Sequence, residues 1–433
     1  MINKQLAKRL IIPSRSLPST TIDSGLYHYM REANGTYTRF HLRVEPDGRG
    51  MLLANATSAA RLSPSGVMIA KDLLDKKSDD EIIHKLKRSF RGASSEEMQA
   101  DLERVAALLA NLAAPGDNYP ILNFEDAEIS PYEAELIAPF QADISLAPYE
   151  TLAPILDRLW EAGIPHAIIL VHERPVGDDL VHIVEHAEDL GMIAGIRGRA
   201  SDIGKGNMVT DLAVAGLDHF NVIYASADSK VHDVLIGHED HQLVFPLFNS
   251  IRENEVAPVA ELPLVAITST LNSLGDTLKN IQMAGIHNVN FWAIAAPDDM
   301  PENERDGALT ASAMPQMADL VEEKANESDV RFIWQPPVMR DPAISIGEQI
   351  RLGARCSSDV SIRVEPNGDV FPPRGPYVSA GNILREDWQT IWHHESFIAY
   401  RTRVERPTRC DECPDLAICA VDCPRKTKGW SQG

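Results

Sequence analysis

The chain has 433 residues, of which 44% are hydrophobic, so it is long enough for about three domains with packed cores. Its 63 acidic residues outnumber 41 basic ones, and the formal net charge of −22 argues against nucleic acid or an anionic membrane as the main partner. No apolar run approaches the roughly 18 residues of a membrane span, and no signal peptide is evident. We therefore expect a cytoplasmic protein that binds neither membranes nor nucleic acids.

The chain is predicted to open with an irregular lead-in and a hairpin. Residues 1–35 carry no periodic pattern. Thr36–Val44 alternates polar and apolar side chains, as a half-buried strand does. A turn at 45–48 leads to a second short strand at 50–54, so the two strands are expected to pair.

Three helices are predicted to follow, with starts at Ser63, Ser78 and Ser95. The second start is a capping box, because Glu81 stands three residues after Ser78 in front of an apolar run. Two strands followed by three short helices predict a small winged-helix-like domain over residues 1–116.

Residues 117–345 alternate helical patterns with short apolar runs. The strands are expected at 166–171, 192–196, 218–224, 262–267, 289–294 and 330–334. Repeated units of this kind imply parallel strands joined by helical crossovers, in a barrel or a doubly wound sheet. Any ligand is then expected at the loops after the carboxyl ends of the strands.

The last predicted domain, residues 346–433, contains every cysteine of the chain. These are Cys356, Cys410, Cys413, Cys419 and Cys423. The last four form a C-x2-C-x5-C-x3-C array, and four thiolates this close suit a structural zinc ion or an iron–sulfur cluster. Disulfides are the alternative, but disulfide frameworks belong to small secreted chains.

Residues 55–86 resemble a PqqD-like domain, the peptide chaperone of pyrroloquinoline quinone synthesis. Related domains, called RiPP recognition elements, bind the leader of a ribosomally made precursor peptide as an added edge strand. This resemblance implies a bound leader peptide beside residues 36–54. A DNA-binding winged helix is the alternative, which the acidic residues Asp79, Asp80 and Glu81 disfavour.

Cys356, Gly368 and the cysteine array have the spacing of the SPASM-domain radical S-adenosylmethionine (SAM) family. Residues 381–392 resemble the segment between the two cysteine groups of that family, and residues 225–237 resemble one of its post-strand segments. The resemblance implies a radical-SAM-like partial (βα) barrel followed by a SPASM domain. Many members of the family modify peptides, as maturases do.

The same resemblance implies an initiating cluster on an early C-x3-C-x2-C loop, but residues 123–135 contain no cysteine. Carboxylates do not replace these ligands, because such clusters select soft thiolates. The Gly-Gly-Glu-Pro segment of the family, which holds the amino group of SAM, is Val171-His172-Glu173-Arg174 here. Only Glu173 is kept as a cofactor-binding residue, so we expect no SAM cleavage and interpret the chain as a pseudoenzyme without catalytic residues.

The cysteine-rich tail also departs from the family, whose pattern implies two clusters. Pro373 stands where the family has a further cysteine, and a final cysteine after the array is missing. Two full clusters need eight ligands, so five thiols leave one cluster, expected to be 4Fe–4S, with Cys356 free or as a substitute ligand. The expected ligands are Cys410, Cys413, Cys419 and Cys423. Zinc on the same four thiolates is the alternative.

The sequence therefore predicts a non-catalytic partner in the modification of ribosomal peptides or proteins, which binds a precursor peptide or a maturase. One alternative is an enzyme that uses the vacant barrel for other chemistry, which a convergent polar set at the strand ends would support. Another is an electron-transfer or regulatory iron–sulfur protein. His238, Asp240 and His241 form a further polar cluster, which we interpret as surface residues rather than a metal site.

Overall fold

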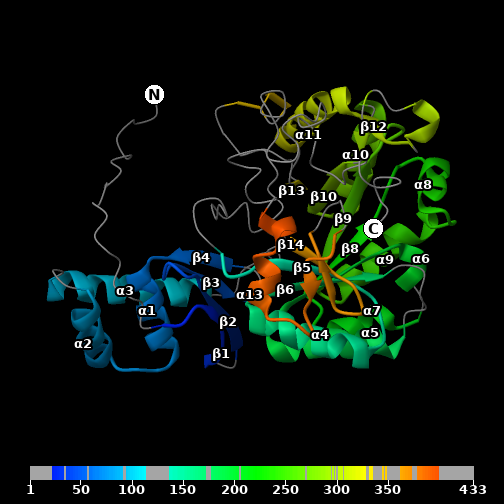
Figure 1. Ribbon diagram of the computed structural model, residues 1–433. Coiled ribbons are helices and arrows are strands. Elements are labelled where there is room, and N and C mark those ends of the chain that lie inside the picture. Colours follow the sequence, from blue (N-terminus) through cyan, green and yellow to red (C-terminus); the bar gives the residue numbers. More distant parts are fainter. Residues whose placement is uncertain are drawn as a thin grey trace.

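The computed structural model (Figure 1) describes most of the chain from residue 22 to residue 398. The described residues are 22–33, 36–55, 58–90, 94–113, 136–171, 177–203, 206–268, 271–293, 295–296, 298, 301–305, 307–327, 331–334, 344–345, 347–348, 361–372 and 378–398. Among them, no helix is long and apolar enough to cross a membrane.

An antiparallel sheet and three helices form the N-terminal module, residues 22–113. The strands lie in the order β1-β2-β3-β4. They are β1 (Gly25–Ala33), β2 (Thr36–Val44), β3 (Gly50–Ala54) and β4 (Ser58–Leu62). The helices are α1 (Pro64–Leu74), α2 (Asp79–Ser89) and α3 (Ser95–Leu112). The predicted hairpin and the three predicted helices are therefore present.

Two of the four strands differ from the sequence prediction. The segment predicted as an irregular lead-in contains β1, which pairs with β2 from Gly25 opposite Val44 to Ala33 opposite Thr36. The short strand β4 pairs with β3 on its other side. Both strands of the predicted hairpin are thus interior strands. The prediction of a peptide added beside residues 36–54 is therefore wrong, because neither strand has a free edge.

The helices of the N-terminal module begin at serine caps. Ser78 and Ser94 form capping boxes with Glu81 and Glu97, in which each side chain bonds a backbone N–H group of the other residue. One face of the antiparallel sheet packs on these helices and forms a separate core. Its members include Phe40, Leu42, Leu52, Ile69, Ile82 and Leu102.

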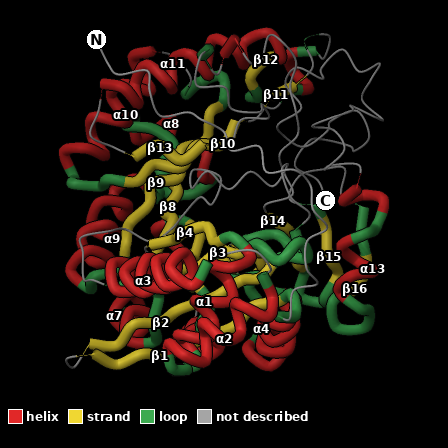
Figure 2. Tube along the Cα trace, turned by 90° about the vertical axis from the view of Figure 1, so that its left-hand side faces the viewer, coloured by secondary structure: helices red, strands yellow, loops and turns green. Residues whose placement is uncertain are grey.

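A ten-stranded sheet forms the centre of the molecule (Figure 2), in the order β13-β10-β9-β8-β7-β6-β5-β14-β15-β16. The pairs from β13 to β14 are parallel, whereas β15 and β16 run antiparallel to their neighbours. The first strands are β5 (Gln141–Ser145), β6 (His166–Val171), β7 (Ile193–Gly198), β8 (His219–Ile223) and β9 (Ala257–Leu264). The others are β10 (Asn288–Ala293), β13 (Arg331–Trp334), β14 (Ser361–Val364), β15 (Asp369–Phe371) and β16 (Gly381–Asn382). The described sheet is open, because its end strands do not pair with each other.

Helical crossovers connect the parallel strands and cover the outer face of the sheet (Figure 1). They are α4 (Tyr149–Ala162), α5 (Asp178–Leu190), α6 (Ala200–Ile203), α7 (Met208–Val214), α8 (Ser229–Ile236), α9 (His241–Glu253), α10 (Leu271–Met283) and α11 (Met314–Glu327). A short sheet of β11 (Ala295–Ala296) and β12 (Leu309–Thr310) precedes α11, and α13 (Trp388–Trp392) follows β16. The predicted alternation of helices and strands is therefore confirmed.

The strand β9 begins earlier than the predicted 262–267. Its sequence contains Pro258 and Pro263, and proline argues against a strand because it donates no backbone hydrogen bond. All eight of its residues are nevertheless buried between β8 and β10. Burial between two neighbouring strands therefore outweighs the unfavourable effect of the two prolines.

The second face of the antiparallel sheet packs on the end of the parallel sheet where the strands begin. Met51 and Leu53 of β3 belong to the large core of the parallel sheet. Arg39 of β2 forms ion pairs with Glu188 at the end of α5 and Asp218 before β8. The N-terminal module thus covers the amino-terminal ends of the parallel strands and leaves their carboxyl ends clear. The predicted domain boundaries at residues 116 and 345 remain predictions.

Candidate functional site

The residues that the sequence singles out as ligands lie outside the described residues. They are Cys356, Cys410, Cys413, Cys419, Cys423 and Glu173. Residues 123–135, where the resemblance places an initiating cluster, lie outside as well. Within the described part of the chain, no group of three or more His, Cys, Asp or Glu side chains is placed to hold a metal ion. The metal site therefore stays a prediction from the cysteine spacing.

Five polar side chains meet on the inner face of the parallel sheet, opposite the helices. Arg197 of β7 donates from Nε to Glu261 of β9 and from Nη1 to Asp143 of β5, both at 2.9 Å. The side-chain amides of Asn221 in β8 and Asn290 in β10 also donate to Glu261, at 2.6 and 2.8 Å. The register brings them together, because Arg197 lies opposite Asn221 and Asn290 lies opposite Glu261.

Burial and charge differ within this inner-face network. The Glu261 side chain is 1% exposed, whereas Arg197 and Asp143 are 25% and 23% exposed. Burial disfavours the charge of Arg197, but Glu261 and Asp143 outweigh burial and raise the pKa of its guanidinium. With both carboxylates ionised, two negative charges and one positive charge leave the network anionic and partly open to solvent.

Two buried histidines extend the inner-face network. His219 donates from Nδ1 to the side-chain oxygen of Asn221 at 2.8 Å, since the amide nitrogen of Asn221 is used by Glu261. His219 Nε2 therefore accepts from His166 Nε2, which lies 2.7 Å away. Burial lowers the pKa of His219 to about 4 and that of His166 well below its usual value, so both rings are neutral near pH 7.

The ring of His219 occupies space that a glycine leaves open. Gly195 lies opposite His219 in the sheet, and a Cβ atom there would lie 2.2 Å from His219 Cε1. Any larger residue at this position would displace the ring. The hydrogen bonds from His166 through His219 to Asn221 and Glu261 therefore depend on Gly195.

The cluster of His238, Asp240 and His241 is structural. His238 is exposed as expected, but Asp240 is fully buried and accepts hydrogen bonds from the backbone N–H of Ser201 and from His232 Nε2. The other ring nitrogen of His232 accepts from the backbone N–H of Ala225, so neither nitrogen is left for proton transfer. Asp240 thus connects loops and holds no catalytic histidine; its interpretation as a surface residue is wrong.

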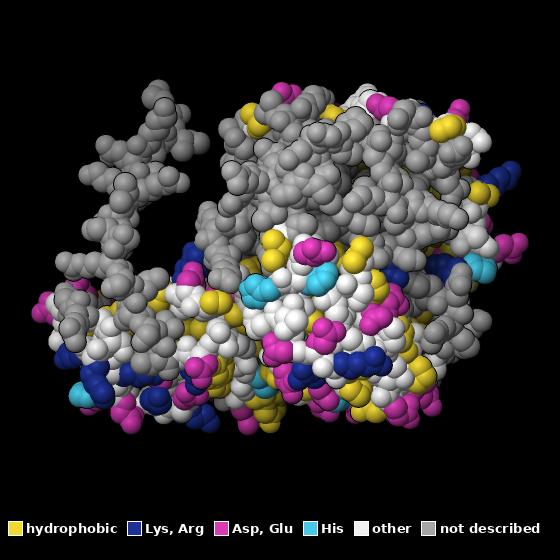
Figure 3. Space-filling model, in the orientation of Figure 1, with side chains coloured by type: hydrophobic (Ala, Val, Ile, Leu, Met, Phe, Trp, Pro, Cys, Tyr) yellow, Lys and Arg dark blue, Asp and Glu magenta, His cyan; other side chains and the backbone are white. Residues whose placement is uncertain are grey.

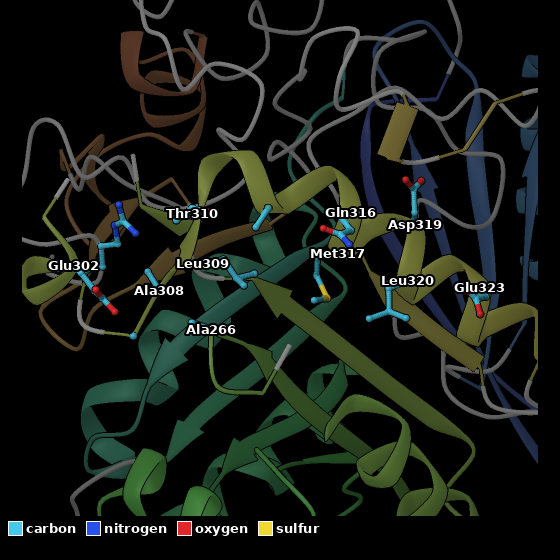
Figure 4. Close-up of a pocket in the computed structure, with 13 residues that line it drawn as sticks. Ala266, Glu302, Ala308, Leu309, Thr310, Gln316, Met317, Asp319, Leu320 and Glu323 are labelled. Atoms are coloured by element: carbon cyan, nitrogen blue, oxygen red, sulfur yellow. The ribbon is translucent and has the colours of Figure 1, made fainter. Parts of the chain in front are cut away.

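A cavity of about 810 Å³ lies beside Ala266, which follows the carboxyl end of β9 (Figure 4). The segment 302–313 and helix α11 enclose it. The polar side chains at its wall are Glu302, Arg305, Thr310, Gln316, Asp319 and Glu323. Asp319 accepts a hydrogen bond from the Ser345 hydroxyl at 2.8 Å, which ties one wall to a distant part of the chain.

Sequence reasoning did not identify the inner-face network, although one signal was present. Strands buried on both faces of a parallel sheet are mostly continuous apolar runs. In β5, Gln141, Asp143 and Ser145 instead alternate with the buried Ala142 and Ile144. Alternation within a parallel strand thus marks a polar inner face. The wall of the cavity has no such signal, because its residues come from loops, the two-residue strand β12 and helix α11.

Comparisons with known proteins agree with this architecture. Residues 356–414 match the SPASM family of iron–sulfur cluster-binding domains. No curated protein matches the sequence. The structure of Streptococcus suis SuiB bound to S-adenosylmethionine is similar, with a TM-score of 0.60 and 15% identity over 92% of this chain and 95% of SuiB. SuiB bound to its precursor peptide SuiA gives a TM-score of 0.59 with the same identity and coverage. The chain therefore has a radical-SAM-like α/β fold, and its residues 356–414 match the SPASM domain family.

Proposed function

We propose that this protein is a non-catalytic, radical-SAM-like partner in the modification of ribosomal peptides or proteins. It binds a precursor peptide or a maturase and carries one C-terminal iron–sulfur site. The proposal rests on one combined observation: the fold is similar to SuiB along 92% of the chain, yet no cysteine precedes Cys356.

The missing cysteines bear on SAM chemistry directly. Cleavage of SAM in the family requires a cluster held by three thiolates, and residues 123–135 supply none. Carboxylates in that segment prefer harder metal ions and do not replace thiolates. Glu173 is left as the single kept residue of the SAM-binding segment, and one residue does not hold the cofactor in place.

The chemistry of the donor set favours one metal group in the tail. Cys410, Cys413, Cys419 and Cys423 would hold it, and four soft thiolates fit a 4Fe–4S cluster. When bound, such a cluster transfers electrons or holds the tail together. The SPASM match over residues 356–414 favours iron–sulfur over zinc, and its range contains Cys356, Cys410 and Cys413.

The N-terminal module is the proposed PqqD-like, winged-helix-like peptide-binding element. A peptide strand adds to a free edge, and the described sheet ends at β1 and β4. We place the peptide at β4, because β4 lies at the level of β5 and β14 in both views, whereas β1 lies below them (Figures 1 and 2) and packs on the outer helix α4 through His28 and Trp160. A peptide held at β4 is nearest to the inner face of the parallel sheet.

Charge separates the N-terminal module from the rest of the protein. Residues 1–113 contain 17 basic and 13 acidic residues, a net charge of +4, whereas residues 114–433 contain 24 basic and 50 acidic residues, a net charge of −26. Lys and Arg side chains gather over the first helices in Figure 3. An acidic leader is therefore attracted to the N-terminal module and repelled by the remainder, which favours the module as the recognition surface.

Photo-crosslinking on the full chain tests this proposal. A photoreactive residue replaces the exposed Arg61 of β4 in one variant and the exposed Met30 of β1 in the other. With a fluorescent precursor peptide encoded beside this protein, we expect saturable binding by anisotropy and crosslinks at position 61. Crosslinks at position 30 and none at position 61 would place the peptide at β1 and contradict its assignment to β4. Binding no tighter than about 1 mM would contradict peptide recognition altogether.

The inner-face network favours a second candidate, an enzyme that uses the sheet for other chemistry. Arg197, Asp143 and Glu261 are a convergent polar set of the kind that such an enzyme needs, and two of them are partly exposed. Incubation of precursor peptide with the protein, followed by mass spectrometry, distinguishes the two candidates. A mass change that Glu261→Gln abolishes would favour the enzyme; an unchanged peptide favours the non-catalytic partner.

A further inference from the structure

Residues 136–140, here called the junction segment, connect parts of the protein that are far apart in sequence. They lead into β5 and lie between the antiparallel sheet and α13 (Figure 1). Leu136, Ile137, Ala138 and Phe140 are at most 7% exposed. Backbone groups buried to this extent need hydrogen-bond partners, and here side chains from two other parts of the chain supply them.

The N-terminal module binds one side of the junction segment through an ion pair. Arg43 of β2 is completely buried, donates to the backbone oxygens of Ala138 and Pro139, and donates from Nε to Glu45 at 2.6 Å. Glu45 accepts from the backbone N–H of Ile137 at 2.8 Å. The guanidinium carbon of Arg43 also lies 4.2 Å from the centre of the Phe140 ring. A buried arginine with this many partners fixes the segment against the module.

Helix α13 binds the same segment through two tryptophans. Trp392 Nε1 donates to the backbone oxygen of Leu136, and Trp388 Nε1 donates to that of Ile137, both at 2.8 Å. The two rings are stacked, with centroids 5.7 Å apart and planes 19° apart. Phe397 also packs on Trp392, with ring centroids 5.3 Å apart. The backbone groups of residues 136–139 are thus hydrogen-bonded by side chains of both the N-terminal module and α13.

We propose that the junction segment couples the N-terminal module to residues 361–398, so that the two parts respond as one cooperative unit. The basis is geometric, because one residue bonds to both parts. The backbone oxygen of Ile137 accepts from Trp388, and its backbone N–H donates to Glu45. A displacement of either part breaks bonds that the other part needs. Occupancy of the N-terminal module by a partner then changes the stability of residues 361–398, which precede the cysteine array in the sequence, and the reverse also holds. This coupling is independent of which partner binds.

Hydrogen exchange of the full chain, read by mass spectrometry, tests the coupling in both directions. Replacement of both Trp388 and Trp392 by phenylalanine removes two donors and keeps the stacked rings. We expect exchange of the β2 and β3 amides to become about tenfold faster, because two buried carbonyl groups lose their partners. The control is Ile391→Val, which loosens the same helix without removing a bond to the segment.

The reverse test starts from the N-terminal module. Arg43→Met should accelerate exchange in residues 378–398 by a similar factor, whereas Arg49→Met, at an exposed arginine paired with Asp47, should not. If the double tryptophan variant fails to fold, Trp392→Phe alone replaces it. If Arg43→Met fails to fold, Arg43→Lys replaces it. Effects confined to the mutated part in both directions would overturn the coupling.

Discussion

Single residues on the inner face of the parallel sheet show how a polar interior is kept stable. Glu261 accepts from Arg197, Asn221 and Asn290, so its buried charge is matched by one cation and two amides. Unpaired, such a carboxylate would cost several kcal/mol. The arrangement is therefore stable in the absence of a ligand.

Gly195→Ala tests how closely the inner-face residues are packed. A Cβ at Gly195 would meet His219 at 2.2 Å, so the ring must move and lose His166 or Asn221. We expect the free energy of unfolding to fall by about 1–3 kcal/mol in urea titrations followed by circular dichroism. Gly275→Ala is the control, because no atom lies within 4 Å of its added Cβ and the residue is helical. Equal stability of both variants would refute the packing argument.

Local signals in the sequence predict those elements that depend on few neighbours. The helices α2 and α3 follow from their serine caps with Glu81 and Glu97, and β2 follows from its alternation. Strand β1 and the first part of β9, residues 257–261, do not follow, because pairing on a sheet edge and burial between two strands decide them. A local pattern reports propensity, and tertiary burial overrides it in these two strands.

The sequence alone indicates the candidate metal site, because its expected ligands are cysteines in a recognisable spacing. The array from Cys410 to Cys423 stands out because cysteine is absent from the first 355 residues. The inner-face network and the contacts of the junction segment depend on common residues such as Arg197 and Arg43, whose partners lie far away in the sequence. Their identification required the register of the sheet, which no single segment specifies.

We expect the contact between β1, β2 and helix α4 to make the stability of the protein depend on acid. His28 and His41 lie beside each other and against Trp160, near Arg39. The pKa of His41 lies well below 6.5, mainly because the ring is buried and also because Arg39 and His28 lie nearby. Burial and the charge of Arg39 likewise lower the pKa of His28. The unfolded chain therefore takes up protons near pH 6.5 that the folded chain still excludes.

Stability should accordingly be constant above about pH 7 and fall as the pH drops below 6.5, because the unfolded state then binds more protons. Each excluded proton contributes up to about 1.4 kcal/mol per pH unit. His41→Gln should make this dependence less steep in thermal unfolding between pH 7 and pH 5, while His28, His166 and His219 keep their contributions. His84→Gln, at an exposed histidine of α2, should leave it unchanged. Identical slopes for the two variants would show that His41 is not responsible.

We expect the cysteine-rich tail to determine which metal the protein carries. We expect one iron–sulfur cluster per chain, measured as iron and sulfide in anaerobically purified protein. Cys413→Ser or Cys419→Ser should remove it, because a site with four thiolates loses a ligand that has no replacement of the same softness. Cys356→Ser should have a milder effect. Stoichiometric zinc without iron or sulfide would contradict the cluster, and full metal retention in a Cys410/Cys413 double variant would contradict the site.

The central claim is that the protein has the radical-SAM-like fold without the ability to cleave SAM. The most direct measurement incubates anaerobically reconstituted protein with SAM, precursor peptide and a strong reductant, and quantifies 5′-deoxyadenosine by liquid chromatography and mass spectrometry. Iron and sulfide are measured in the same sample, so that an empty tail site is not mistaken for inactivity. We predict no 5′-deoxyadenosine above a control without protein, because residues 123–135 offer no thiolates. Its accumulation in proportion to protein concentration would contradict the account.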